Sequence, residues 1–360
     1  MRRSLLMRLI KTAIISTLAI CAVFAGYASA HPGWGILLDR EGQIFFSDVQ
    51  TNTIWKLNRE GRLEAIVTHK HSHSLFGDEQ GNLFGEHVYY DSAGARWISS
   101  IWKLSRDGQL TDVVPPTDSP PSGSGIFLDT TGNIYSVHGG ASESEWAELL
   151  KRSPDGQITV IAGGQRGHAD GNGAQAKFNY VIGMVWGADG SLYATDGACA
   201  RKITMDGTVT TIGGNPLAGV PRSEHPRLLG IAVDLSDNVY VADYDYGCVR
   251  QIARDGAVKT LVNSGFYWSP SGVTAVGDDL YVLEHQPESA VAVLAALNIG
   301  PYMRVRKLPA DGTVTTLATV WGRNTALASV VAIGVLVLAF GGWRLRKRRR
   351  AHRARLTSES

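Results

Sequence analysis

Through the middle of the chain, apolar and polar residues alternate in short runs that are bounded by Gly, Asp, Asn and Pro. Residues 54–57, 239–242 and 314–317 are three such runs, and all contain β-branched or aromatic side chains. Because successive side chains of a strand point to opposite faces, this pattern predicts β-strands.

The strands belong to a repeat. An acidic residue followed by glycine recurs between two β-prone runs, and successive glycines lie 47, 48, 51, 49 and 56 residues apart. Such dipeptides are strong signals for hairpins. A second hairpin precedes each one, as in residues 230–243, so each repeat is predicted to contain four strands. The dipeptides are Glu60-Gly61, Asp107-Gly108, Asp155-Gly156, Asp206-Gly207, Asp255-Gly256 and Asp311-Gly312.

Six such repeats predict an all-β fold. A single four-stranded sheet cannot bury both of its faces, whereas six sheets arranged radially bury them against one another. Residues 31–319 allow about 48 residues per sheet, which is typical of a propeller blade. We therefore expect a six-bladed β-propeller of four-stranded blades over residues 31–319.

The N-terminal residues have the pattern of an export signal. Arg2, Arg3, Arg8 and Lys11 precede an apolar run over residues 12–24, and Ala28-Ser29-Ala30 follows. This order predicts a signal peptide over residues 1–30, cleaved after Ala30. The alternative is an uncleaved anchor, but the apolar run is short for a membrane span.

The C-terminal residues predict a membrane anchor. The run from Thr325 to Trp343 contains no charge and would rise about 28 Å as a helix, enough to cross a bilayer. The basic tail, residues 344–360, is expected in the cytoplasm by the positive-inside rule. Residues 320–324 would form a linker. We therefore expect a single-pass membrane protein whose propeller is extracytoplasmic, in the periplasm or outside the cell.

Charge and cysteine content narrow the functions. The chain has a net charge of +2, but residues 31–324 hold 23 Lys and Arg against 32 Asp and Glu, a net charge of −9. A nucleic-acid-binding domain needs a basic surface, so we expect no nucleic-acid partner. Cys199 and Cys248 occupy equivalent positions in neighbouring repeats, too far apart for a disulfide, so both are expected to be thiols.

The fourth repeat resembles an NHL repeat. The resemblance lies in residues 171–178, 183–185, 192–196, 201–203 and 209–214, and the fifth repeat matches nearly as well over residues 231–262. It implies membership of the NHL-repeat β-propeller family, as a membrane-anchored bacterial-type protein. Propellers of this type include binding modules, lyases and hydrolases, so the resemblance implies the fold more than the function.

One face of the propeller is predicted to bind. The links from second to third strand and from blade to blade share one face, named here the top face, and the tight turns share the bottom face. The top links are long, including inserts at residues 87–100, 138–148 and 284–304, and long loops on a rigid scaffold commonly bind ligands. Each second strand is expected to end in an acid or a histidine. These candidate binding residues are Asp48, His87, His138, Asp196, Asp243 and Glu284.

Two of these residues belong to a possible metal site. His69, His71 and His73 alternate at the start of the second blade, and clustered imidazoles suit zinc. His69 is expected in an exposed loop. The predicted metal ligands are His71, His73, His87 and His138. The calcium pattern of gluconolactonase-like propellers is absent, because the corresponding positions are Trp34, His73, Ser124, Ile182, Leu229 and Ser271.

Two functions remain open from the sequence. The first is a membrane-tethered propeller whose top face binds a protein, a glycan or a small ligand, for instance a membrane-proximal protein or a lipid-linked molecule. The second is a metal-dependent lyase or hydrolase that uses the histidines at the mouth of the channel. For the first three aspartates of the candidate set, Asp48, Asp196 and Asp243, capping of their own loops is the alternative role.

Overall fold

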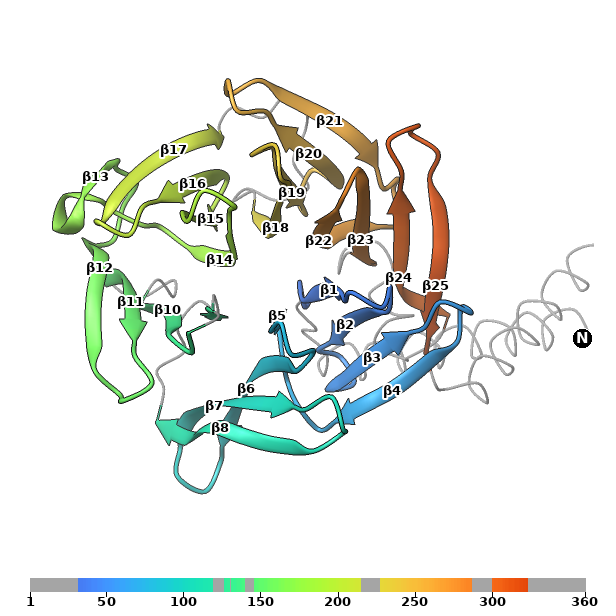
Figure 1. Ribbon diagram of the computed structural model, residues 1–360, viewed down its shortest axis with the longest axis horizontal. Helices are drawn as coiled ribbons and strands as arrows, with labels where there is room; N and C mark the ends of the chain where they lie inside the picture. Colours follow the sequence, from blue (N-terminus) through green and yellow to red (C-terminus); the bar gives the residue numbers. More distant parts are fainter. Residues whose placement is uncertain are drawn as a thin grey trace, which may run out of the picture. The chain divides into compact units, whose positions relative to one another are not determined.

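The computed structural model describes residues 32–118, 126–129, 131–139, 146–214, 227–286 and 300–322. Its larger compact unit lies within residues 29–290 and 303–319 and contains the propeller. Six antiparallel sheets surround a central channel in this unit (Figure 1), so the predicted six-bladed propeller is confirmed. The described residues 300–302 and 320–322 group with a second unit.

Each blade consists of strands that pair in chain order, the first strand lying innermost. The first three blades are β1 (Ile36–Leu38), β2 (Ile44–Asp48), β3 (Thr53–Leu57) and β4 (Leu63–Thr68); β5 (Leu75–Gly77), β6 (Leu83–Asp91), β7 (Arg96–Leu104) and β8 (Leu110–Asp118); and β9 (Ile126–Leu128), β10 (Ile134–Gly139), β11 (Trp146–Arg152) and β12 (Ile158–Gln165). The last three are β14 (Val181–Trp186), β15 (Leu192–Asp196), β16 (Cys199–Ile203) and β17 (Thr208–Gly214); β18 (Leu228–Val233), β19 (Val239–Asp243), β20 (Cys248–Ile252) and β21 (Val258–Asn263); and β22 (Ser269–Val276), β23 (Asp279–His285), β24 (Pro301–Leu308) and β25 (Thr315–Trp321).

The acidic–glycine dipeptides form the turns between third and fourth strands. Their glycines have φ between 77° and 90°, a left-handed conformation that side chains rarely tolerate. The repeat signal in the sequence is therefore a backbone requirement, and the hairpin prediction is confirmed at all six positions.

The structure differs from the predicted elements in two blades. The fourth blade gains a fifth strand, β13 (Gly171–Asn172), which pairs with β17 and leads into a short 3-10 helix, Gly173–Gln175. In the second blade, most of the predicted insert at residues 87–100 is not a loop. Strands β6 and β7 continue through it, because Tyr89 opposite Ile98 and Tyr90 opposite Trp97 extend the ladder with cross-strand pairs.

Strand ends also differ from the prediction. β2, β15 and β19 end at the expected aspartates, but β6 continues beyond His87 to Asp91, β10 continues to Gly139 and β23 continues to His285. The last strand, Thr315–Trp321, continues four residues beyond the β-prone run at residues 314–317. In each case the backbone ladder runs further toward the top face than the sequence pattern indicates.

The hydrophobic core lies between neighbouring blades. Ile54 of the first blade packs with Trp102 of the second, and Leu149 of the third blade packs with Phe178 and Ile203 of the fourth. These side chains are almost completely buried. The innermost strands leave a narrow channel with a cavity of about 210 Å³, lined by all six of them. Burial between blades is the reason that the repeat is stable only as a ring.

The innermost strands approach one another closely at glycines. A Cβ atom on Gly230 would lie 2.7 Å from the Cα of Gly272, and one on Gly272 would lie 2.4 Å from the carbonyl oxygen of Trp34. Gly183 meets the carbonyl oxygen of Leu229 at 2.4 Å in the same way, and Gly35 meets the backbone nitrogen of Leu75 at 2.8 Å. Each of these glycines faces the next blade, so backbone packs on backbone around the channel.

The predicted signal peptide, residues 1–30, the span from Thr325 to Trp343 and the basic tail, residues 344–360, lie outside the described residues. Within the described ranges, no helix has the length and apolar character needed to cross a bilayer. Both described cysteines, Cys199 and Cys248, are thiols in the structure, as predicted.

Candidate binding site at the top of the channel

A cluster of apolar side chains near the starts of the innermost strands lies at the top end of the channel. Trp34 packs against Ile182, Leu229 and Tyr244 from the fourth and fifth blades, with Tyr180 beside them. These residues make an apolar patch on the side of the mouth formed by the first, fourth and fifth blades. The second blade contributes His73, whose ring stacks on Trp34 with centroids 4.9 Å apart.

The second blade departs from the repeat at two linked positions. Where the first, fourth, fifth and sixth blades have glycine at the start of the innermost strand, this blade has Ser74. Where the second strands of other blades carry Ser47, Thr195 or Ala242, it carries Glu86, which is fully buried. Glu86 Oε2 accepts a hydrogen bond from Ser74 Oγ at 2.7 Å. The two exceptions thus bind each other.

Glu86 also holds His73. Its Oε1 accepts hydrogen bonds from the backbone N–H groups of His73 and of Ser74, the latter at 3.0 Å, and lies 3.2 Å from His73 Nδ1. Burial alone would raise the pKa of Glu86, but the hydrogen bonds and charge of His73, with the hydrogen bonds of Ser74, lower it below the usual value. An ionised carboxylate only accepts, so His73 Nδ1 carries the proton of this contact.

His71 and His87 complete a histidine cluster, defined here as His71, His73 and His87. The rings of His71 and His73 meet edge to face at 4.8 Å, and the backbone N–H of His71 donates to His87 Nδ1 at 2.9 Å. Burial lowers the pKa of His87, and the nearby Lys70 lowers it further. Since Nδ1 accepts a hydrogen bond, His87 is neutral at physiological pH.

The sixth blade contributes His285 at the junction with the first blade. This imidazole is buried, makes a hydrogen bond to the backbone of Gly33 and interacts electrostatically with Asp48. Burial lowers its pKa to about 4 in spite of that carboxylate. His285 is therefore neutral above about pH 5.

Two buried ring nitrogens near the mouth lack a hydrogen-bond partner in the described structure. They are Nε1 of Trp34 and Nε2 of His285. An indole N–H can only donate, while Nε2 of a neutral imidazole that donates through Nδ1 can only accept. Leaving such groups unsatisfied costs about 1–3 kcal/mol each, and buried polar atoms without partners commonly mark a place for water or a ligand.

The sequence-predicted aspartates are tied into the scaffold. Asp48 accepts from Thr51 N and Oγ1 and from Trp55 Nε1. Asp196 accepts from the backbone of Asn179 and Tyr180 at 2.7 Å and pairs with the fully buried Arg201 at 2.9 Å. Asp243 accepts from Tyr246 N and pairs with Arg250 at 2.7 Å. The contacts with loop residues are those of loop caps, and the contacts with Trp55, Arg201 and Arg250 tie the carboxylates to the neighbouring third strands.

The other predicted site residues differ in burial. Glu284 is buried and bound by Ser264 Oγ at 2.6 Å and by Arg304 and Arg306. His138 is exposed on β10, opposite Glu148. The structure brings together His71, His73 and His87 of the predicted metal ligands, and the described residues contain no group of three His, Cys, Asp or Glu side chains with the arrangement of a metal site.

Sequence reasoning missed Glu86 and Ser74, and it passed over Trp34 and His285 as ligand-binding residues. The signal for the first two was present, because each breaks the repeat at its own position in the same blade. Nothing in the sequence marks the unsatisfied nitrogens of Trp34 and His285, since these arise from packing.

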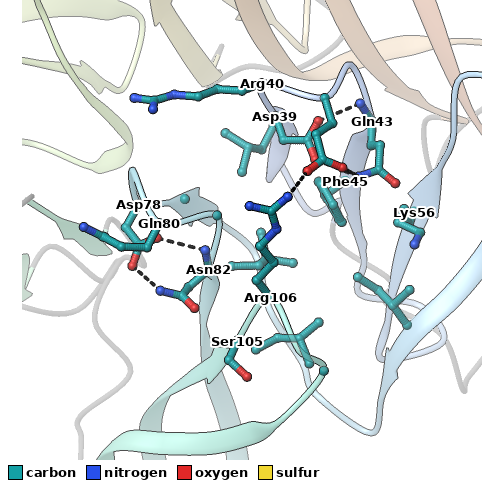
Figure 2. A pocket seen from close by; sticks show the side chains of 18 of the residues that line it. Asp39, Arg40, Gln43, Phe45, Lys56, Asp78, Gln80, Asn82, Ser105 and Arg106 are labelled. Carbon is teal, nitrogen blue, oxygen red and sulfur yellow. Dashed lines mark hydrogen bonds and ion pairs between the residues drawn. The ribbon is translucent and has the colours of Figure 1, made fainter.

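A larger cleft of about 840 Å³ lies on the bottom face between the first and second blades (Figure 2). Its floor includes Leu37 and Phe45, and its rim is charged. Each cation of the lining has a carboxylate partner: Arg106 with Glu41 at 2.6 Å, Arg40 with Glu79 at 3.5 Å and Lys56 with Glu64 at 3.7 Å. The turn residues Asp39 and Asp78 bind Gln43 and Asn82. The rim therefore offers a ligand little uncompensated charge.

Comparisons with known proteins agree on the fold. No family model matches the chain, and no curated protein matches it. Among solved structures, a calcium-binding regucalcin from Agrobacterium tumefaciens str. C58 is similar at 12% identity and TM-score 0.51, over 72% of this chain and 85% of that one. A gluconolactonase from Xanthomonas campestris is similar at 14% identity and TM-score 0.50, over 70% and 83%. At such identities the likeness shows a propeller fold alone.

Proposed function

We propose that this protein is a membrane-tethered, extracytoplasmic propeller of NHL type that binds a ligand at the top of its channel. The proposed site consists of Trp34, His73, Glu86, His87 and His285. The ligand is a small polar molecule, or the protruding polar part of a glycan or a protein, because the channel cavity measures about 210 Å³ and the unsatisfied atoms are hydrogen-bonding groups.

The observation that carries this proposal is the unsatisfied pair of ring nitrogens. Trp34 Nε1 requires an acceptor and His285 Nε2 requires a donor, and hydroxyl groups supply both. The stacked rings of Trp34 and His73 add a flat apolar surface beside them. Glu86 fixes the orientation of His73, so the site does not have to be ordered by the ligand.

The tether is supported by the sequence pattern of the span from Thr325 to Trp343 and its basic tail. Export is supported by the signal-like residues 1–30. Together these two patterns support a site outside the cytoplasm, where the ligand would be an envelope or extracellular molecule.

The test is a binding screen with the full chain in detergent micelles, against immobilised glycans, peptides and small polyols, followed by the Trp34→Phe variant. Phenylalanine keeps the ring but removes the N–H, so we expect affinity for the ligand found to fall about tenfold, the value of one hydrogen bond. Trp146→Phe, on an exposed ring of the same face, is the matched control. Unchanged affinity in Trp34→Phe would place the binding site elsewhere.

A metal-dependent lyase or hydrolase is the second candidate. The contact between Glu86 and His73 favours it, because a buried carboxylate that orients an imidazole is an arrangement used by general bases and by metal ligands. The nitrogen atoms of His71, His73 and His87 are then the expected zinc ligands, and metal analysis separates this function from simple binding.

A further inference from the structure

The strongly exposed aromatic side chains of the described propeller all lie on its top face. Tyr89, Tyr90 and Trp97 flank the turn between β6 and β7, Trp146 begins β11, and Phe266 and Tyr267 lie in the link from β21 to β22. Their exposed fractions reach 56% for Trp146 and 75% for Phe266. The links between second and third strands and between blades are the ones that form this face.

The bottom face exposes a different type of side chain. Its strongly exposed large side chains in the described ranges are aliphatic or methionine, located in or beside the turns between first and second or third and fourth strands. Leu235, with 89% of its surface exposed, is the clearest example. The members of this group are Leu110, Ile158, Met205, Leu235, Val258, Val276 and Val314. Single exposed apolar side chains are ordinary, but the strongly exposed aromatic ones of the described propeller gather on one face.

The top aromatics are held in position by local contacts. Tyr90 and Trp97 face each other across the β6–β7 ladder with ring centroids 5.5 Å apart. Arg96, beside them, pairs with Asp118 at 2.8 Å. Phe266 and Tyr267 meet edge to face at 5.2 Å. The rings therefore project from the face without having to be ordered by a partner.

Their distribution indicates a broad partner. The aromatic positions belong to the second and third blades and to the link between the fifth and sixth blades, on different sides of the channel in the ring of Figure 1. A small ligand cannot contact all of them. An extended surface can, and Tyr and Trp, with an apolar ring and one polar atom, are the side chains that favour the interface between lipid headgroups and hydrocarbon.

We propose that the top face contacts the surface of a phospholipid bilayer through these aromatic side chains. This inference rests on the proposed tether: only five residues separate Thr319 of β25, which runs toward the top face, from Thr325, and they extend to at most about 20 Å. The strand from which the chain continues to the proposed anchor thus runs toward the face that carries the rings. The mouth of the channel then opens toward the membrane.

The test uses the full chain in phosphatidylcholine–phosphatidylglycerol nanodiscs, with single nitroxide labels at Phe266→Cys, Trp146→Cys or, as the control, Leu235→Cys. Cys199 is replaced by Ser in each, because it is the less buried of the two described thiols. The accessibility of each label to oxygen and to a water-soluble nickel complex is measured. We expect the ratio of oxygen to nickel accessibility to be severalfold higher at positions 266 and 146 than at position 235.

Equal, water-like ratios at all three positions would overturn the lipid contact. Labels that are water-exposed in nanodiscs but immobilised in native membranes would also overturn it, and would assign the face to a protein partner. Alkaline extraction of native membranes tests the tether separately. If the full chain is extracted, the tether is wrong, and the same labels with added vesicles decide the lipid contact by itself.

Discussion

Ser74 donates its hydroxyl hydrogen bond to Glu86 at 2.7 Å, and both residues are exceptions to the repeat in which they occur. The hydroxyl and the carboxylate support each other: the buried charge requires donors, and the serine supplies two of them, its N–H and its O–H. The second blade therefore differs from its neighbours in having Ser74 and Glu86 as hydrogen-bonded partners beside the stacked ring of His73.

Replacement of Glu86 by glutamine is expected to destabilise the fold. The amide can accept at one oxygen only, and its NH₂ group would face the donors of His73 and Ser74. We expect the free energy of unfolding to fall by about 1–3 kcal/mol per unsatisfied group, measured by urea denaturation at pH 7. Glu79→Gln, in an exposed ion pair of the bottom cleft, should change it by less than about 1 kcal/mol. Equal effects of the two variants would contradict the role of Glu86.

His285 should make stability depend on pH. Its folded pKa of about 4 lies below the unfolded value of 6.5, so the unfolded chain binds the extra proton between these values. Stability contributed by neutral His285 is therefore complete above about pH 6.5 and is lost as the pH falls toward 4. Protonation linked to this residue would lower the free energy of unfolding by at most about 3 kcal/mol.

The variant His285→Gln should lack this part of the pH dependence. Urea denaturation at pH 4.5 and pH 7.5 measures it, and the difference between the two pH values should be smaller in His285→Gln than in the unaltered protein. His138→Gln, at an exposed position, is the control and should retain the full difference. The same difference in all three proteins would mean that His285 is not buried as described.

Metal analysis separates the two candidate functions. If the protein binds its ligand without catalysis, we expect the full chain, purified without chelators, to contain well below one equivalent of zinc. About one equivalent of a transition metal, lost in His73→Ala or His87→Ala, would make the lyase or hydrolase the leading function. His69→Ala, outside the cluster, controls for unspecific loss.

Gly230→Ala should strain the centre of the propeller. The added methyl group would lie 2.7 Å from the Cα of Gly272, and backbone atoms cannot move aside as a flexible side chain does. We expect a loss of about 1–3 kcal/mol in the free energy of unfolding, the usual range for overpacking. Ser236→Ala, in an exposed turn of the same blade, should be nearly neutral. A neutral Gly230→Ala would show that the inner strands are less closely packed.

The ring of blades was predictable because its signals are local and repeated. Each acidic–glycine turn needs a left-handed φ, and six such turns at similar spacing define six hairpins. The length of β6 and β7 was not predictable in this way. Tyr89, Tyr90 and Trp97 favour strands, but small and polar residues separate them, and only the pairing across the hairpin shows that the strands continue this far.

The candidate site was predictable in part. The spacing of histidines at alternate positions indicated His71 and His73, and the structure places them together with His87. The role of the acidic residues at the strand ends in binding stays a prediction; the structure adds that Asp196 and Asp243 pair with arginines that lie five and seven residues further along the chain. Whether a carboxylate is buried and paired depends on the packing of the blades, which the sequence pattern does not reveal.

The glycine contacts around the channel have a consequence for any molecule that arrives there. Gly183, Gly230 and Gly272 set the separation of the inner strands β14, β18, β22 and β1 by direct contact of main-chain atoms, so these strands cannot move closer. This part of the channel wall therefore has a fixed geometry. For a ligand bound as proposed, little affinity would be lost to reshaping it, and discrimination between similar ligands would fall to the side chains beside it, Trp34 and His73 foremost.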